Sequence, residues 1–216
     1  MRAAVFLLLL PLLAVASPAR AQDPPPRIPW FAVDLHASVP RFPDSDLLAA
    51  SRDVVLAELP GRGLGLQTAV TLYPVRWRAV TFGIGGELIT SRARKTPAAP
   101  AAGQTTTLRA TEERFRSIAP QLSFNFGSGH GWSYISGGLG RSTWSLVPAD
   151  RAAFPSDAEA LKTINYGGGA RWFMKSHLAF SFDVRFYAIN PGAPYLSVPG
   201  TPRTTLLVIG AGASIK

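Results

Sequence analysis

The chain has 216 residues, with 22 Lys or Arg against 13 Asp or Glu and a formal net charge of +9 at pH 7. It contains no cysteine, which excludes disulfides and thiolate metal sites. The basic residues are scattered rather than clustered in one run, so the sequence lacks the basic patch of a nucleic-acid-binding protein. Its 20 glycines and 19 prolines argue against a helical protein.

Residues 1–21 have the features of an export signal. An arginine precedes the apolar run AAVFLLLLPLLAVA, and the segment ends in the small-residue pattern Ala-Arg-Ala at 19–21. We expect cleavage after this pattern, a short N-terminal tail over 22–28 and one domain over 29–216. An uncleaved membrane anchor is the alternative. No later segment has the roughly 18 uninterrupted apolar residues that a spanning helix needs.

Behind the signal, apolar and polar residues alternate in eight segments. Period two is the pattern of a β-strand with one apolar and one polar face. Each segment can cross a bilayer at a tilt, which takes about 9–11 residues. In the Gly-rich fifth segment the pattern does not fix which residues share a face. The segments are residues 29–40, 63–73, 79–92, 113–126, 132–144, 163–174, 178–189 and 203–215.

The connections between these segments alternate in length. Long ones are expected at 41–62, 93–112, 145–162 and 190–202, and short ones at YPVRWR (73–78), 127–131 and 175–177. In an antiparallel meander, alternate connections share one end of the sheet, so all long loops lie together. Short periplasmic turns and longer outer loops are typical of outer-membrane barrels. The sequence therefore predicts an all-β fold, a closed eight-stranded antiparallel up-and-down transmembrane β-barrel.

The segment LAFSFDVRFYAI at 178–189 raises the question of which strand face meets lipid. A secreted lipocalin-like barrel would bury the apolar face around an apolar ligand. However, all four lysines lie in connections or at segment ends, and small residues dominate the polar faces. We therefore predict that Phe180, Phe182 and Val184 face lipid, whereas Asp183 and Arg185 face the lumen.

Two sets of side chains follow from this orientation. Aromatic residues near segment ends resemble the girdles at the two membrane interfaces. They are Trp30, Phe31, Tyr73, Trp77, Phe126, Trp132, Trp144, Trp172, Phe186 and Tyr187. Charged residues on the polar faces are expected to pair in the lumen, because an unpaired buried charge is costly. This structural ion-pair network is predicted to contain Asp34, Glu87, Arg141, Arg171, Asp183 and Arg185.

The stretches INYGGGARWF, LAFSFDVRFYAI and LLVIGAGASI resemble the OmpA/OmpX/OmpW-like family of small bacterial outer-membrane β-barrel domains. The resemblance implies a location in the cell outer membrane and a structural, loop-mediated binding or minor transport role without catalysis. It also implies contact with outer-membrane lipid and lipopolysaccharide, and insertion by the barrel-assembly machinery. The end Ser214-Ile215-Lys216 departs from the family's aromatic terminus. The sequence does not identify a loop partner.

The sequence predicts no catalytic, cofactor-binding or metal-binding residues. His36-Ala37-Ser38 has the His-x-Ser form found in lipid-A-modifying barrel enzymes, which is a further alternative. These residues belong to the lumen-facing set, however, whereas an acyl substrate would arrive from the lipid side. The histidines at 36, 130 and 177 lack metal-ligand spacing. The glycines at 83–86 and 167–169 do not open a helix, as a phosphate loop would.

Overall fold

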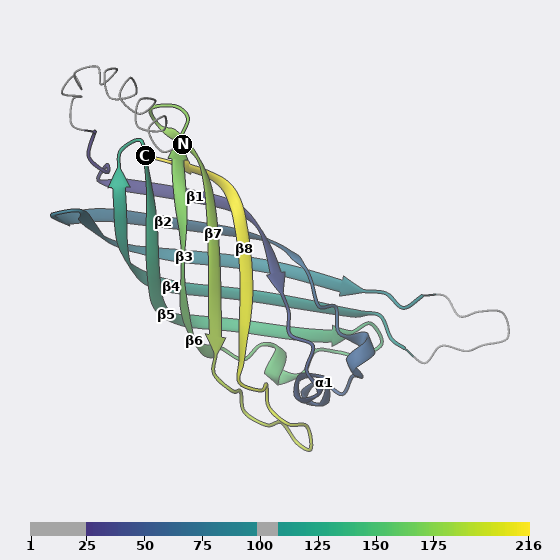
Figure 1. The fold of residues 1–216 in the computed structure, drawn as a ribbon. Coiled ribbons are helices and arrows are strands. Elements are labelled where there is room, and N and C mark those ends of the chain that lie inside the picture. The colour runs from purple at the N-terminus through teal and green to yellow at the C-terminus, as the bar shows by residue number, and fades with distance from the viewer. Residues whose placement is uncertain (1–24, 99–107) are drawn as a thin grey trace, which may run out of the picture.

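The computed structural model describes residues 25–98 and 108–216, so the predicted signal at 1–21 lies outside the described residues. Eight strands form most of this part of the chain (Figure 1). No helix in the described part is long and apolar enough to cross a membrane. The strands are β1 (Phe31–Arg41), β2 (Leu64–Trp77), β3 (Val80–Lys95), β4 (Thr111–Ser128), β5 (Gly131–Pro148), β6 (Leu161–Phe173), β7 (Leu178–Ile189) and β8 (Thr204–Ile215).

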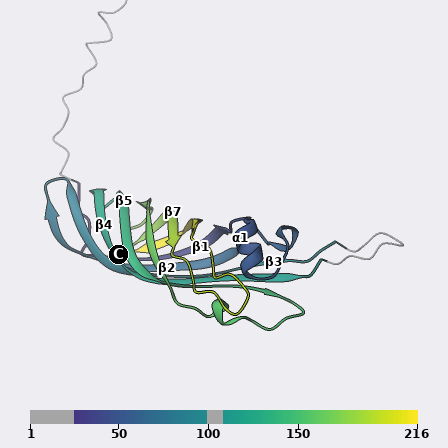
Figure 2. The same cartoon turned by 90° about the horizontal axis from the view of Figure 1, so that it is seen from below.

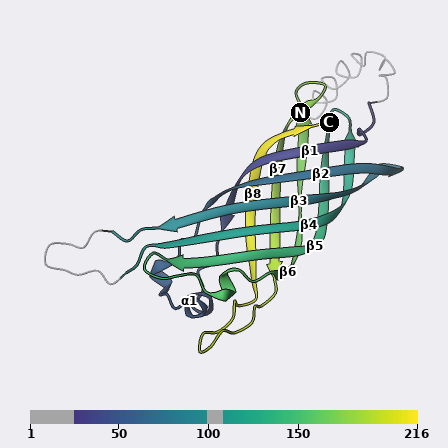
Figure 3. The same ribbon diagram turned by 180° about the vertical axis from the view of Figure 1, so that it is seen from behind.

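The sheet closes on itself in sequence order, with every neighbouring pair antiparallel. The closing pair is β1 with β8, running from Val33 opposite Ile215 to Arg41 opposite Leu207 (Figure 3). Closure leaves no strand edge unpaired, which a sheet in lipid requires because lipid cannot satisfy backbone groups. The predicted closed eight-stranded meander is confirmed.

The long connections lie at one end of the barrel and the short turns at the other, as the sequence predicts. The β1–β2 connection contains helix α1 (Asp46–Ser51) and the 3-10 helix η2 (Leu56–Glu58), and the β5–β6 connection contains η3 (Pro155–Asp157). Figure 2 shows α1 at the end from which the long connections leave. We call this the loop end and the opposite one the turn end.

The first short turn differs from the prediction for YPVRWR. Strand β2 continues to Trp77, and the pairing with β3 shifts register between Leu72 and Val75. Pro74 lies in this irregularity, where a residue without a backbone N–H is tolerated. The chain reverses only at Arg78 and Ala79, where Arg78 has a left-handed φ of 54°. The extra strand length projects the β2–β3 hairpin beyond the other strands at the turn end (Figure 1).

The apolar strand faces point outward. On β7, the side chains of Phe180 and Phe182 are 46% and 37% exposed, whereas Asp183 and Arg185 are 1% and 2% exposed. The same alternation runs along β1, where Leu35 and Val39 are exposed and His36 is buried. The predicted orientation is confirmed, and the lipocalin-like alternative, with its apolar interior and polar exterior, is wrong for these strands.

Four residues assigned to the aromatic girdles lie inside the barrel instead: Tyr73, Trp132, Trp144 and Tyr187 are buried. The expectation failed because a position near a strand end does not reveal which face a side chain is on. Trp30, Trp77 and Trp172 remain exposed.

The interior changes character along its length. Towards the loop end, side chains from the β1–β2 connection pack with those of strands β3 to β8 in one apolar cluster. The chain from Phe42 to Leu59 therefore folds over the mouth of the barrel and fills it from above. The cluster consists of Phe42, Leu48, Ala49, Val54, Leu59, Ile89, Ala93, Phe115, Trp144, Leu146, Leu161, Tyr187, Ile189, Leu206 and Val208.

Candidate functional site

The lumen towards the turn end contains the first half of the predicted ion-pair network. Arg171 on β6 reaches across to Asp34 on β1, with Nη2–Oδ2 at 2.5 Å and Nε–Oδ1 at 2.8 Å. Ser214 on β8 also donates to Asp34, and the guanidinium carbon of Arg171 lies 4.2 Å from the ring centroid of Tyr134. This bidentate pair, with both partners buried, joins two strands that are not neighbours in the sheet.

The second half is centred on Arg185 on β7. Its Nε lies 2.7 Å from Oε2 of Glu87, and its Nη2 lies 3.0 Å from Oδ2 of Asp183. Gln67 donates to both carboxylates at 3.0 and 3.2 Å, and the Tyr187 hydroxyl donates to Glu87 at 2.5 Å. The two carboxylates thus share one arginine and take neutral donors for their remaining oxygens, which offsets the cost of their burial.

Gly169 on β6 makes room for this network. A Cβ at this position would lie 2.1 Å from the backbone oxygen of Phe182 and 2.7 Å from the hydroxyl of Tyr134. That hydroxyl donates to Oδ2 of Asp183 at 2.7 Å. Gly169 therefore leaves space for the large side chain of Tyr134. This packing role gives the glycines at 167–169 a reason other than a phosphate loop.

Arg141 was predicted to belong to the ion-pair network, but it does not. The structure brings Asp34, Glu87, Arg171, Asp183 and Arg185 together in the lumen, but Arg141 is exposed on the outer face of β5. The Gly-rich fifth segment had left its alternation undecided. In the structure Trp132, Tyr134 and Trp144 point inward, so position 141 has the outward parity.

The network fills the lumen across its width. The cavity among Asp34, His36, Gln67, Tyr134 and Arg185 has a volume of about 10 Å³. A void of roughly 10–15 Å³ holds about one water molecule. The cavity among these residues therefore has room for about one water molecule.

Buried charged residues hold the long connections together at the loop end. We call this set, Arg52, Glu58 and Asp157, the lock, and its main member is Arg52. It is 1% exposed, follows α1, and forms an ion pair with Asp157 of η3 at 2.9 Å. Its Nη2 also donates to the Thr201 hydroxyl at 2.8 Å and to the Trp144 carbonyl at 3.2 Å. Since Thr201 belongs to the β7–β8 connection, one side chain joins three of the four long connections to the barrel wall.

The fourth long connection is joined through Glu58 of η2. Its Oε1 accepts hydrogen bonds from Arg109 N at 2.7 Å and Nε at 3.2 Å, and Thr111 donates to its carbonyl. Burial acts to raise the pKa of Glu58, but the hydrogen bonds from Arg109 and Val55 outweigh it and hold the pKa below its ordinary value.

The sequence does not predict this lock. Arg52, Glu58 and Asp157 lie in connections, where no strand periodicity marks a side chain as buried. The only sign of their burial in the sequence is a charged residue beside an apolar stretch in a long loop. That sign does not identify the residue with which the charge pairs.

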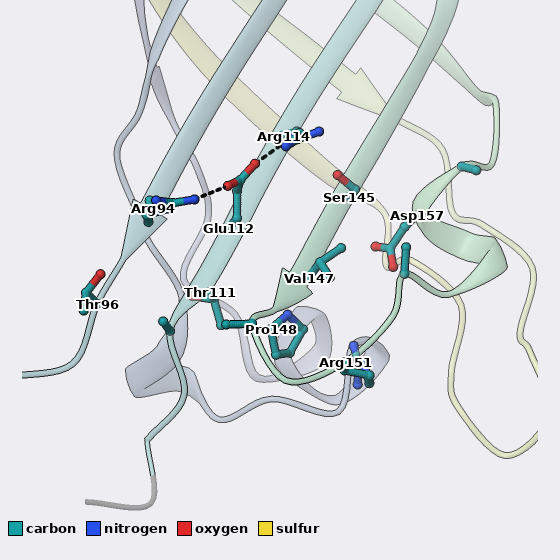
Figure 4. Close-up of a pocket in the computed structure, with 14 residues that line it drawn as sticks. Arg94, Thr96, Thr111, Glu112, Arg114, Ser145, Val147, Pro148, Arg151 and Asp157 are labelled. Carbon is teal, nitrogen blue, oxygen red and sulfur yellow. Dashed lines mark hydrogen bonds and ion pairs between the residues drawn. The ribbon is translucent and has the colours of Figure 1, made fainter.

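A pocket of about 710 Å³ lies beside the lock, on the outer side of strands β3 to β5 (Figure 4). Glu112 on β4 is drawn between Arg94 and Arg114 and bonds both, the first at 2.9 Å. Arg92 also bonds Glu112, and Arg151 from the β5–β6 connection lines the far side. Three arginines around one carboxylate leave a positive excess, so the pocket is suited to acidic ligands.

The His-x-Ser motif considered in the sequence lies on the inner face of β1. His36 is buried in the lumen with its Nε2 2.7 Å from the Ser181 hydroxyl, and Ser38 is buried on the same face of β1. The described residues contain no group of three or more His, Cys, Asp or Glu side chains able to hold a metal ion.

An apolar exterior, a paired-charge interior and a closed eight-strand meander define the chain as an outer-membrane type of β-barrel. The solved structure of Neisserial surface protein A aligns with a TM-score of 0.55 at 13% identity, over 87% of this chain and 97% of that one. The likeness shows that this chain has the fold of the small outer-membrane barrels.

Weaker alignments are to two other barrels. Ail of Yersinia pestis aligns at a TM-score of 0.46 and 11% identity, over 86% of this chain and 95% of that one. The N-terminal barrel domain of Pseudomonas aeruginosa OprF aligns at 0.44 and 10%, over 85% and 96%. No protein-family model matches the chain, and no curated protein matches its sequence.

Proposed function

We propose that this protein is a non-conducting, non-catalytic barrel of the cell outer membrane that presents a rigid loop platform for binding. The filled lumen is the observation that carries this proposal. An ion-pair layer leaves a void of only about 10 Å³, and an apolar cluster closes the loop end above it. A solute would have to break both layers to pass, which argues against a transport role.

Binding is assigned to the loop end, because function in barrels of this architecture resides in the connections that a rigid scaffold holds in place. The pocket of Figure 4 lies within the 300–1,000 Å³ range of small-molecule sites. Arg94, Arg114 and Arg151 on its rim favour a partner with acidic groups. Arg52 and Glu58 fix the surrounding connections, so the platform is preorganised for binding.

The lipid-A-modifying alternative receives no support from His36. Its ring contacts Ser181 across the lumen, whereas an acyl chain in the membrane reaches only the outer face. Replacing His36 by Ala should leave the acylation pattern of lipid A unchanged in the producing cell. An altered pattern would show that the barrel is an enzyme.

Planar-bilayer recording tests the proposal directly. The protein is reconstituted without tags, its folded state is checked by heat-modifiable gel migration, and current is recorded beside an open porin. We expect no conductance steps from the native chain. Regular steps from the folded native protein would overturn the non-conducting assignment, which is inferred from the filled lumen.

A further inference from the structure

Three basic side chains stand next to one another on the outer face of the barrel. Arg116 on β4, Arg141 on β5 and Lys162 on β6 are all exposed. Arg141 lies directly opposite Lys162 in the β5–β6 pairing and opposite Ile118 in the β4–β5 pairing. Arg116 is two residues from Ile118, so it is the diagonal neighbour of Arg141. Like charges directly opposite one another destabilise a sheet.

These three cations have no partner within the described part of the chain, where their side chains form no ion pair or hydrogen bond. The neighbouring cluster of Arg92, Arg94 and Arg114 differs, because all three bond Glu112. The outer wall therefore has one basic cluster that bonds a carboxylate and, beside it, one basic cluster that bonds none. The charge of the second cluster can be compensated only by an anion from outside the described part of the chain.

An apolar groove of about 630 Å³ adjoins the cluster on the turn-end side. It is lined by Ile118 and Pro120 of β4, Leu139 of β5 and Ile164 of β6, with Arg141 and Lys162 at its margin. On each of the three strands the cation is two residues nearer the loop end than an apolar groove residue. Two residues along a strand span about 7 Å, so the groove meets the charges over a short distance.

We propose that this groove and the cations above it form a site for one lipid A molecule. An acyl chain lies along Ile118, Leu139 and Ile164, and a phosphate group sits against Arg116, Arg141 and Lys162. Arginine and lysine both bind phosphate oxygens through charge-assisted hydrogen bonds. This inference rests on the proposed function, because an outer-membrane location makes the loop end face the lipopolysaccharide leaflet.

The structure supplies a matched control across the barrel. Arg41 on β1 and Arg62 form another exposed, bridged pair of arginines at the loop end. In an eight-strand barrel β1 is opposite β5, so this pair lies far from the groove. Replacing it by glutamines removes the same formal charge and leaves the groove intact.

Native mass spectrometry of the folded, detergent-solubilised protein tests the site, with lipid A titrated against each variant. We expect R141Q/K162Q to weaken lipid A binding at least tenfold and R41Q/R62Q to change it less than twofold. Phosphatase-treated lipid A should bind the native chain as weakly as lipid A binds R141Q/K162Q. Phosphatidylglycerol, which carries a phosphate diester and fewer acyl chains, should bind at least tenfold more weakly than lipid A.

Equal losses in the two double variants would overturn the site, and so would undiminished binding of the dephosphorylated lipid. Equal affinity for phosphatidylglycerol would overturn the assignment to lipid A. Gel migration and bilayer recording on the same samples separate the two proposals. A folded, silent barrel that ignores lipid A contradicts only this inference, whereas a conducting barrel contradicts only the proposed function.

Discussion

The two ends of the barrel interior are filled by opposite chemistry. Towards the turn end, Asp34 pairs with Arg171, and Arg185 holds Glu87 and Asp183. Towards the loop end, Phe115 and Trp144 pack against Phe42 and Leu48 from the β1–β2 connection. Both layers are buried, yet only the second contains side chains from a loop.

The difference shows that two kinds of contact stabilise the barrel. Paired charges hold the strands, whereas apolar packing holds the long connections at the loop end, which we call the cap. Charges on strands can pair across the lumen because the sheet fixes their positions. Neighbouring neutral side chains donate hydrogen bonds to the carboxylate oxygens as well. A loop is better held by apolar packing, which tolerates small displacements, and by a few anchors such as Arg52. Changes in the charged layer should therefore affect the whole barrel, whereas changes at the cap should affect the loops first.

Replacing Arg185 by Met should have the largest effect. The change leaves Glu87 and Asp183 buried without their cation, and breaking a buried pair costs about 3–5 kcal/mol. We expect a clear fall in the temperature at which heat-modifiable migration is lost. Arg141→Met makes the same chemical change on the outer face and should leave that temperature almost unaltered. Equal behaviour of the two variants would contradict a structural role for the network.

Replacing Trp144 by Ala should rank second. Truncating a buried Trp costs about 3 kcal/mol or more, and the change also removes the hydrogen bond from Nε1 to Glu113, which is 2.8 Å long. Urea unfolding in lipid vesicles measures the loss. Trp172→Ala on the outer face is the control. A similar loss of stability there would contradict the view that the apolar cluster stabilises the barrel more than an exposed tryptophan does.

Replacing Arg52 by Ala should act mainly on the cap. Asp157 would keep its bonds from the backbone N–H groups of Leu146 and Phe154, so the expected loss is about 1–3 kcal/mol. Limited proteolysis should cut the β5–β6 and β7–β8 connections faster, while the barrel keeps its gel migration. Unchanged cleavage would mean that Arg52 does not lock these loops.

Acidification should loosen the Glu58 anchor, the smallest of these effects. Since the pKa of Glu58 is lowered in the folded state, its stabilisation is complete above its ordinary value of 4.5 and is lost as the pH falls through the folded value. Amide exchange at Arg109, corrected for its intrinsic pH dependence, should therefore quicken at low pH. Glu58→Gln should abolish that dependence, and a persistent one would assign it to another group.

Strand alternation made much of this fold predictable. A period of two on β1, β3, β6 and β7, together with the alternation of loop lengths, was enough to predict the closed meander. The same period placed Asp34, Glu87, Arg171, Asp183 and Arg185 on inner faces. Arg141 failed because glycines around it removed the side-chain contrast that defines a face. The aromatic assignment failed at Tyr73 and Trp132 because interface position and lumen position look alike in sequence.

The loop cap could not be predicted in the same way. Arg52 and Asp157 are 105 residues apart in the chain, and their contact depends on how two irregular connections fold over the barrel mouth. Neither residue sits in a repeating pattern. Long-range loop packing of this kind is a property of the closed barrel rather than of a local segment.

Two tryptophans provide the most direct test of the outward-apolar, inward-charged arrangement. Trp132 on β5 lies opposite Arg171, the residue next to Trp172 on β6, yet the two indoles are 3% and 53% exposed. Each is kept as the sole tryptophan of a variant reconstituted in vesicles of brominated lipid. The account predicts strong fluorescence quenching of Trp172 and weak quenching of Trp132. Equal quenching, or stronger quenching of Trp132, would contradict it.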